Sequence, residues 1–295
     1  MARIARRRAL GLLACAPLAG CARGGTSITV GSKNFTEELL LGELYAQVLE
    51  RHGMPVTRKL NLGGTQIAMA ALQRGEIDLY PEYTGTALLV VLGRPPLRDA
   101  REIYATVKRE YADKYQLTWL APAPMNDTQA LATTQAIRSH LHIETLSDLS
   151  KAAPQLRLGA IPEFVKRPDG LPGLQQAYGG FVFKSVRLLD IGLKYKALQH
   201  GDVDVVVAFG TDGAIAADNL YVFVDDKHVW PTYQAAPVVR NSALAKYPGI
   251  ADALDRLAPL LTDDVMRRLN ESIDGPLKRE PADVAHEFIE QHKLG

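Results

Sequence analysis

Cysteine is almost absent from this chain of 295 residues, which contains only Cys15 and Cys21. Two cysteines near one end cannot form the disulfide framework of a small secreted domain or a zinc site built on several thiolates. An excess of one charge is also lacking, because 34 basic and 33 acidic side chains leave a formal net charge of +1. This balance lacks the positive excess that attracts nucleic acid, and we expect no nucleic-acid partner.

Catalytic and cofactor motifs are missing as well. The sequence contains no GxGxxG, phosphate-binding P-loop, GxSxG or HExxH. The seven histidines show no paired helical spacing, and we expect His140 and His142 to be solvated in a polar loop. We therefore expect neither a metal nor a cofactor, and we rank an enzyme as the third candidate class. The acids that an enzyme would have to use are Asp78, Glu82, Glu163 and Asp204.

The first twenty residues differ in composition from the rest. Four arginines (Arg3 and residues 6–8) precede an apolar run over residues 9–18, which is shorter than the about 20 residues that span a bilayer. Such an order predicts an export signal over residues 1–20. The arginine cluster also loosely resembles a twin-arginine signal, so the export route stays open. Without this segment the chain carries 30 basic and 33 acidic side chains, a net charge of −3.

The end of this signal, residues 18–21 (LAGC), resembles a bacterial lipobox. The resemblance implies cleavage before Cys21, which becomes the first mature residue, and acylation of its thiol. We then expect an exported lipoprotein, periplasmic or at the cell surface, tethered to a membrane through its lipid. A plain secretory signal followed by a fortuitous cysteine is the alternative.

Strand and helix patterns alternate along the body of the chain. A β-rich run at 27–30 precedes apolar residues at helical spacing over 36–51, with Gly53 as a stop. A strand pattern at 56–62 precedes a second helix, which opens at residues 63–65 (GGT) and stops at Gly75 before a strand at 77–80. The alternation predicts an α/β fold with helices on the faces of a sheet.

An internal echo predicts that this construction occurs twice. Residues 71–78 (ALQRGEID) return 126 residues later as 197–204 (ALQHGDVD). The echo aligns Tyr83 with Phe209 and Thr86 with Asp212. Because ligands bind beyond the carboxyl ends of strands in open α/β sheets, two such lobes would place Tyr83 and Phe209 across one cleft. The alternative is that a common helix–turn–strand motif simply occurs twice, without two similar lobes.

Two segments are suited to carry the chain between the lobes. The first predicted connection from lobe 1 to lobe 2 contains Pro122, Pro124 and residues 126–128 (NDT). The predicted connection back to lobe 1 is residues 225–231. We therefore assign residues 26–125 plus 235–295 to lobe 1 and residues 126–234 to lobe 2, two Rossmann-like lobes joined by a hinge. Amphipathic spacing predicts three C-terminal helices, over residues 250–260, 263–273 and 282–292, that pack back on lobe 1.

Several tyrosines lie close to the predicted ends of these elements. Residues 80–86 (YPEYTGT) form a polar, aromatic strand exit, while Tyr195 lies on a helix and Tyr233 follows a turn. Taken singly, each tyrosine is typical of amphipathic packing. Gathered around one space, their π faces would hold a quaternary ammonium, since each cation–π contact contributes roughly 0.5–2 kcal/mol.

Four motifs in order resemble the substrate-binding proteins of osmoprotectant ABC transporters, the receptors for glycine betaine, choline and carnitine. The motifs are residues 31–37 (GSKNFTE), 62–65 (LGGT), 78–86 (DLYPEYTGT) and 163–170 (EF and RPDG at its two ends). The resemblance runs from about Ile28 to the C-terminus. It implies a type II periplasmic-binding-protein fold, an aromatic cage between the lobes, and a monomer that delivers its solute to a permease and its ATPase.

The resemblance also assigns roles to individual positions. It implies cage tyrosines at Tyr83, Tyr195 and Tyr233, carboxylate-binding residues at Lys33, Thr86 and Arg167, and a residue that sets ligand range at Gln66. As donors only, Lys33 and Arg167 suit a carboxylate and repel an ammonium.

Two positions depart from the family pattern. Gln129 stands where an aromatic is usual and Phe209 where tyrosine is common, which weakens glycine betaine as the ligand. Gln129 could hydrogen-bond a less methylated or more polar solute. A receptor for a different small polar solute, such as an amino acid or a sulfur-containing betaine, is therefore the second candidate.

Overall fold

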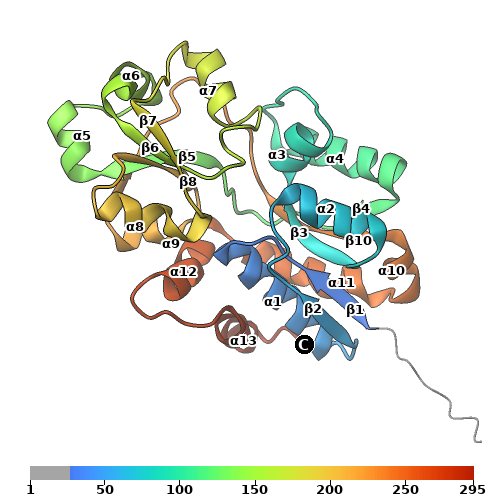
Figure 1. Ribbon diagram of the computed structural model, residues 1–295. Helices are drawn as coiled ribbons and strands as arrows, with labels where there is room; N and C mark the ends of the chain where they lie inside the picture. The colour runs from blue at the N-terminus through green and yellow to red at the C-terminus, as the bar shows by residue number, and fades with distance from the viewer. Residues whose placement is uncertain (1–26) are drawn as a thin grey trace, which may run out of the picture.

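The computed structural model describes residues 27–295, so the predicted signal and Cys21 lie outside the described residues. Two five-stranded sheets lie in two α/β bodies side by side (Figure 1). The first sheet has the order β2-β1-β3-β10-β4 and the second the order β7-β6-β8-β5-β9. The prediction of two α/β lobes is confirmed.

The strands of the two sheets have the following bounds. In the first sheet they are β1 (Ile28–Gly31), β2 (Val56–Lys59), β3 (Leu79–Tyr83), β4 (Leu117–Trp119) and β10 (Ala235–Arg240). In the second they are β5 (Gln129–Thr134), β6 (Arg157–Ala160), β7 (Ser185–Leu188), β8 (Val205–Phe209) and β9 (Leu220–Val222).

Helices connect these strands and cover the sheets. The helices before β8 are α1 (Thr36–Arg51), α2 (Thr65–Arg74), α3 (Thr84–Thr86), α4 (Ala100–Tyr115), α5 (Gln135–Leu141), α6 (Leu146–Ala152), α7 (Leu171–Tyr178) and α8 (Lys194–Gln199). Those after it are α9 (Gly213–Ala217), α10 (Asn241–Lys246), α11 (Gly249–Leu257), α12 (Asp263–Asp274) and α13 (Pro281–His292). Helix α1 has the predicted bounds; its first turn carries Glu37 and Glu38, and its last turn carries Arg51, which complements the helix dipole.

The two sheets have the same topology. In the first, β1 pairs in parallel with β2 and β3, and β10 runs antiparallel to β3 and β4. In the second, β6 pairs in parallel with β7 and β8, and β5 runs antiparallel to β8 and β9. The echo in the sequence therefore marks a repeat of the whole sheet.

The repeated segment builds the same junction in each lobe. Gly75 after α2 and Gly201 after α8 both have the left-handed conformation, with φ of 74° and 70°, which suits glycine. Asp78 then accepts the backbone N–H of Thr29 at 2.9 Å, and Asp204 that of Arg157 at 2.8 Å. The two aspartates thus tie neighbouring parallel strands together, and in the first lobe β3 begins at Leu79, after the predicted residue 77.

The C-terminal helices complete the first lobe. Helices α11, α12 and α13 all contact α1, and their buried side chains share one core with β1 and α1. Helix α12 also packs on α9 of the second lobe. The sequence predicted that the C-terminal helices pack on lobe 1, and α12 contacts lobe 2 as well. Among residues 27–295 no helix is long and apolar enough to cross a membrane.

The chain passes between the sheets twice, after β4 and after β9. The two crossing segments hydrogen-bond to each other, because Ala123 N–H donates to Ala235 O at 2.8 Å and Asp127 N–H to Tyr233 O at 3.0 Å. The Asn126 side chain also accepts the N–H of Tyr233 at 2.7 Å. This pairing supports the predicted lobe limits, which stay a prediction.

Candidate functional site

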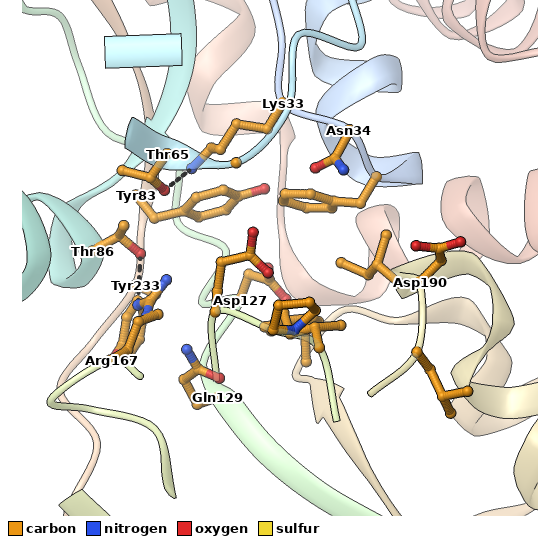
Figure 2. A pocket seen from close by; sticks show the side chains of 18 residues that line it. Lys33, Asn34, Thr65, Tyr83, Thr86, Asp127, Gln129, Arg167, Asp190 and Tyr233 are labelled. Atoms are coloured by element: carbon orange, nitrogen blue, oxygen red, sulfur yellow. Dashed lines mark hydrogen bonds between the residues drawn. The ribbon is translucent and has the colours of Figure 1, made fainter. Parts of the chain in front are cut away.

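A cavity of about 190 Å³ lies between the two lobes at the carboxyl ends of β3 and β8 (Figure 2). Both Tyr83 and Phe209 line it, as the repeat predicts. Seven of the nine predicted ligand-binding residues lie around this one space: Lys33, Tyr83, Thr86, Gln129, Arg167, Phe209 and Tyr233. Their roles toward a ligand stay predictions.

Gln66, the eighth predicted residue, lies outside this cavity. It is an exposed residue in the first turn of α2 and lines a neighbouring cavity of about 420 Å³. That cavity shares Gly64, Thr65, Glu163 and Arg167 with the first. Gln66 therefore lies at an extension of the central cavity.

Tyr195, the ninth, does not line this cavity. Its hydroxyl donates to Asp212 Oδ2 at 2.5 Å, and the Lys194 ammonium lies 4.8 Å from its ring centroid. Among the described residues it lines a different cavity, next to α12. These contacts hold Tyr195 away from the central cavity in this conformation.

An aromatic wall runs along the cavity from one lobe to the other. The ring of Phe35 lies 6.2 Å from that of Tyr83 and 6.2 Å from that of Phe209, with interplanar angles of 25° and 17°. Phe35 was not among the predicted residues. Its signal in the sequence was its place directly before α1, between Lys33 and Glu37 in the GSKNFTE motif.

Lys33 lines the cavity, and its ammonium is paired with two glutamates. Its ammonium donates to Glu82 Oε1 at 2.6 Å, lies 3.6 Å from Glu38 Oε1 and is 4.7 Å from the centroid of the Tyr83 ring. Burial raises the pKa of Glu38 to about 8, although the charge of Lys33 acts in the opposite direction. The positive charge of Lys33 is therefore largely balanced before any ligand arrives.

Arg167 forms the other cationic group at the cavity. Its Nε donates to Asp169 Oδ1 at 2.8 Å, and its Nη2 donates to Thr86 Oγ1 at 3.3 Å across the lobes. Burial acts to raise the pKa of Asp169, but the hydrogen bond and charge of Arg167 hold it below its usual value. Asp169 also accepts the Tyr233 hydroxyl at 2.6 Å. Asp169 therefore holds both the Arg167 guanidinium and the Tyr233 ring in place at this end of the cavity.

The position of Tyr233 explains the glycine of the YPEYTGT segment. A Cβ added to Gly85 would lie 2.7 Å from two ring carbons of Tyr233, closer than any van der Waals contact allows. Gly85 thus permits the ring to pack directly on the backbone of α3, which follows β3.

Two buried carboxyl groups meet at a single hydroxyl beside the cavity. Thr211 Oγ1 lies 2.5 Å from Glu37 Oε2 and 2.7 Å from Asp127 Oδ1. A hydroxyl has one hydrogen to donate, so one of these contacts requires a proton on a carboxyl group. Burial raises the pKa of Glu37 to about 7 and that of Asp127 well above its usual value. The pair therefore retains a proton near neutral pH.

This carboxyl pair also joins distant parts of the fold. Glu37 accepts the Tyr83 hydroxyl at 2.8 Å and the Asn270 amide at 2.8 Å, in addition to Thr211. The pair thus links α1, the end of β3, α12 and the second lobe. Together with the contact between Arg167 and Thr86, it shows the lobes closed on the cavity.

The cavity has more acidic than basic groups in its lining. Asp127, Glu163 and Asp190 line it together with Lys33 and Arg167, and Asp127 lies opposite Lys33 and Thr65 (Figure 2). Within residues 27–295 no group of three or more His, Cys, Asp and Glu is placed to hold a metal ion. The arrangement offers π faces and a carboxyl group to a cation, and Arg167 and Thr86 to an anion.

Comparison with known proteins identifies similar chains. Residues 26–291 match the family described as the substrate-binding domain of the ABC-type glycine betaine transport system. The chain is 36% identical over 263 residues to the glycine betaine-binding protein YehZ of Escherichia coli (strain K12), which covers 85% of this chain and 86% of that protein.

Another relative is much longer. The chain is 35% identical over 265 residues to the ergothioneine transport permease/ergothioneine binding protein EgtU of Helicobacter pylori (strain G27). The match covers 90% of this chain and 47% of that protein, so this chain spans about half the length of that relative.

A solved structure described as a glycine betaine/carnitine/choline ABC transporter matches with a TM-score of 0.74 and 31% identity. The match covers 91% of this chain and 99% of that one. These matches confirm the type II periplasmic-binding-protein fold that the motifs implied.

Proposed function

Since the chain belongs to the family of substrate-binding domains of ABC-type glycine betaine transport systems, we propose that its interlobe cavity captures a small quaternary ammonium solute of the glycine betaine, choline or carnitine type. The family consists of substrate-binding proteins of ABC importers and not of enzymes. Such a protein works outside the cytoplasm and delivers its solute to a membrane permease.

The observation that carries the proposal is the two-ended chemistry of the cavity. The wall of Tyr83, Phe35 and Phe209, next to the carboxyl group of Asp127, suits a cationic head without hydrogen-bond donors. Arg167 supplies N–H groups and Thr86 a hydroxyl at the other end, where a carboxylate would bind. A volume of about 190 Å³ favours a small solute, since pockets for drug-sized ligands run from about 300 Å³ upward.

Closure of the lobes is the mechanism that this geometry supports. Arg167 belongs to one lobe and Thr86 to the other, and Thr211 reaches across to Glu37 in the same way. A solute that contacts both lobes binds the closed form more tightly than the open form, and therefore shifts the equilibrium toward closure. The permease would then recognise the closed protein.

We extend the proposal to the partners and the location. An ATPase drives the permease, Cys21 carries a lipid that holds the protein at a membrane surface, and the protein acts as a monomer. The lipobox-like residues 18–21 support the anchor. The central cavity is completed by the two lobes of one chain, which supports a monomer.

A sulfur-containing betaine is the second candidate ligand. One relative at 35% identity is named as an ergothioneine-binding protein. The central cavity adjoins the cavity of about 420 Å³ next to Gln66, which offers room for a larger group on the solute. An amino acid without a quaternary nitrogen would leave the aromatic wall unused and is less well supported.

A thermal-shift screen of residues 27–295 against glycine betaine, choline, carnitine, proline betaine and ergothioneine tests the proposal. We expect at least one of these solutes to raise the melting temperature in a concentration-dependent way, because ligand that binds only the folded state stabilises it. Glycine and proline, which lack the quaternary nitrogen, serve as controls. Stabilisation by the controls alone, or by none of the solutes, would contradict the proposal.

A further inference from the structure

Asp127 connects the buried carboxyl pair to the central cavity. It lines the cavity with 6% of its surface exposed. Its Oδ1 contacts the backbone N–H and the hydroxyl of Thr211, whereas its Oδ2 bonds to no group within residues 27–295 and is not fully enclosed. In Figure 2 the carboxyl group points toward Tyr83, one of the rings proposed to hold the cationic head. A positive charge in the cavity would therefore act directly on Asp127.

Glu37, the second acid of the pair, does not line this cavity. Its Oε1 accepts the Tyr83 hydroxyl at 2.8 Å, and its Oε2 contacts the Thr211 hydroxyl at 2.5 Å and accepts the Asn270 amide at 2.8 Å. Because Thr211 has one hydroxyl hydrogen, its contacts with both acids require a proton on Glu37 or Asp127. With that proton the pair carries one negative charge, and without it the pair carries two.

The surroundings of the pair disfavour the second negative charge. Within residues 27–295 neither acid forms an ion pair, and the charge of Asp212, which is bonded to Lys194 at 2.8 Å, repels both. Burial raises the pKa of Glu37 to about 7 and that of Asp127 well above its usual value. The other titratable groups that face the pair or Asp212 are Tyr45, Tyr83, Tyr195 and Asp274. A cation in the cavity would supply the positive charge that the proton supplies in its absence.

We infer that Glu37 and Asp127 form a proton-binding site whose proton is exchanged for the cationic head of the solute. The inference rests on the proposed function and deepens it. When a quaternary ammonium binds beside Asp127, the O–H bond of the protonated carboxyl group breaks and the proton passes to the buffer. The total charge of the site stays the same, because one positive charge replaces another. A solute that releases a proton on binding binds more tightly as the pH rises.

Calorimetric titration in phosphate and in Tris at the same pH counts the protons released, because the two buffers differ in ionisation enthalpy. The probes are the five quaternary solutes of the thermal-shift screen, whose nitrogen has no proton and whose carboxylates titrate well below neutral pH. We expect each solute that binds to release about half a proton to one proton near pH 7, and its affinity to rise about tenfold or more from about pH 6 to about pH 8. Among residues 27–295 no histidine lines the cavity as an alternative source of the proton.

Three variants assign the proton to this pair. Asp127→Asn keeps the shape of the side chain and removes the acid, so the proton release and the dependence of affinity on pH should both disappear. Glu37→Gln removes the partner acid from outside the cavity and should lower the release at least twofold, which tests the inference even if Asp127→Asn no longer folds or binds. Asp190→Asn changes an exposed acid that lines the same cavity and should keep the release. Thermal melting of each variant before titration establishes that it is folded.

Different failures have different consequences. Solutes that bind without releasing a proton, at an affinity that is constant with pH, would overturn the inference and leave the proposed function standing. Release that persists undiminished in Glu37→Gln or Asp127→Asn would assign the proton to another acid, such as Glu38, and would also overturn the inference. Absence of binding by all five solutes would overturn the proposed function itself.

Discussion

The two lobes share one topology but use the ends of their strands differently. In both, an aspartate after a left-handed glycine accepts the backbone N–H of the neighbouring strand, Asp78 in one lobe and Asp204 in the other. Five residues further on the lobes diverge. Tyr83 donates its hydroxyl to buried Glu37, whereas Phe209 has no hydroxyl and has the Lys194 ammonium 4.2 Å from its ring centroid.

This comparison separates the part of each repeat that builds the sheet from the part that builds the site. The residues that stay alike, at the junction of helix and strand, lie at the opposite end of the strand from the cavity. The residues that differ lie at the carboxyl ends, where ligands bind in folds of this kind. The first lobe supplies Lys33 and Thr86 to the cavity, and the second supplies Arg167 and Gln129.

The sharpest test of the divergence replaces the two equivalent aromatic residues in turn. Tyr83→Ala removes a π face and a hydrogen bond to Glu37, so we expect it to weaken binding of a quaternary ammonium about 100-fold. Phe209→Ala removes only a π face and no hydrogen bond, and should weaken binding about tenfold. Calorimetric titration measures both. Tyr83→Phe, which keeps the ring, is the control, and a larger loss from Phe209→Ala would break the comparison.

The shared junctions can be tested through stability. Asp78→Ala and Asp204→Ala should each lower the free energy of unfolding by about 1–3 kcal/mol, because each leaves a strand N–H without its acceptor. The loss should be greater for Asp204, which accepts from the Arg157 guanidinium at 2.7 and 2.9 Å, whereas Asp78 accepts from Arg240 at 3.4 Å. Denaturant unfolding provides the measurement. Asparagine at either position keeps one acceptor oxygen and should restore part of the loss; no loss from either alanine would refute the structural role.

The contact between the lobes at Glu37 predicts a dependence on pH. Burial raises the pKa of Glu37 from 4.5 to about 7, so the folded protein holds a proton that the unfolded chain releases. The stabilisation is fully present below pH 4.5 and is lost as the pH rises through about 7. The groups that surround this carboxyl are Tyr83, Thr211, Asn270, Asp127 and Asp212.

Denaturant unfolding across this range should therefore show the protein becoming less stable, with a slope of about 1 kcal/mol per pH unit from this group. Glu38, whose pKa is raised to about 8, acts in the same direction. Glu37→Gln should flatten the decline, whereas Glu271→Gln, at a half-buried position of α12, should leave it unchanged. An equally steep decline in Glu37→Gln would assign the effect to other groups.

Much of the fold follows from local patterns in the sequence. The apolar spacing of residues 36–51 fixes the bounds of α1, and the echo at residues 71–78 and 197–204 reveals the repeated sheet because helix stop, glycine and strand entry are all encoded locally. The contact of α12 with both lobes could not be predicted from its amphipathic spacing, which shows that a face is buried but not against what.

The site was only partly predictable for the same reason. Residues next to strand ends, such as Tyr83 and Phe209, reach the cavity because topology places them there. Phe35 follows the carboxyl end of β1 and was missed although its motif was noted, whereas Asp127 lies in the segment between the lobes, whose path no spacing in the sequence encodes. Tyr195 is turned to Asp212 by a hydrogen bond between residues 17 positions apart, and the burial of Gln129 without a partner is visible only in three dimensions.

The central claim, that the cavity recognises a quaternary ammonium through its charge, can be tested by one calorimetric comparison. Glycine betaine and choline would each be titrated beside the isostere in which carbon replaces the ammonium nitrogen, tert-butylacetate for betaine and the tert-butyl analogue for choline. The shapes match and only the positive charge is lost. The account predicts that at least one cation binds about tenfold or more tightly than its isostere. Equal affinity for cation and isostere would contradict it.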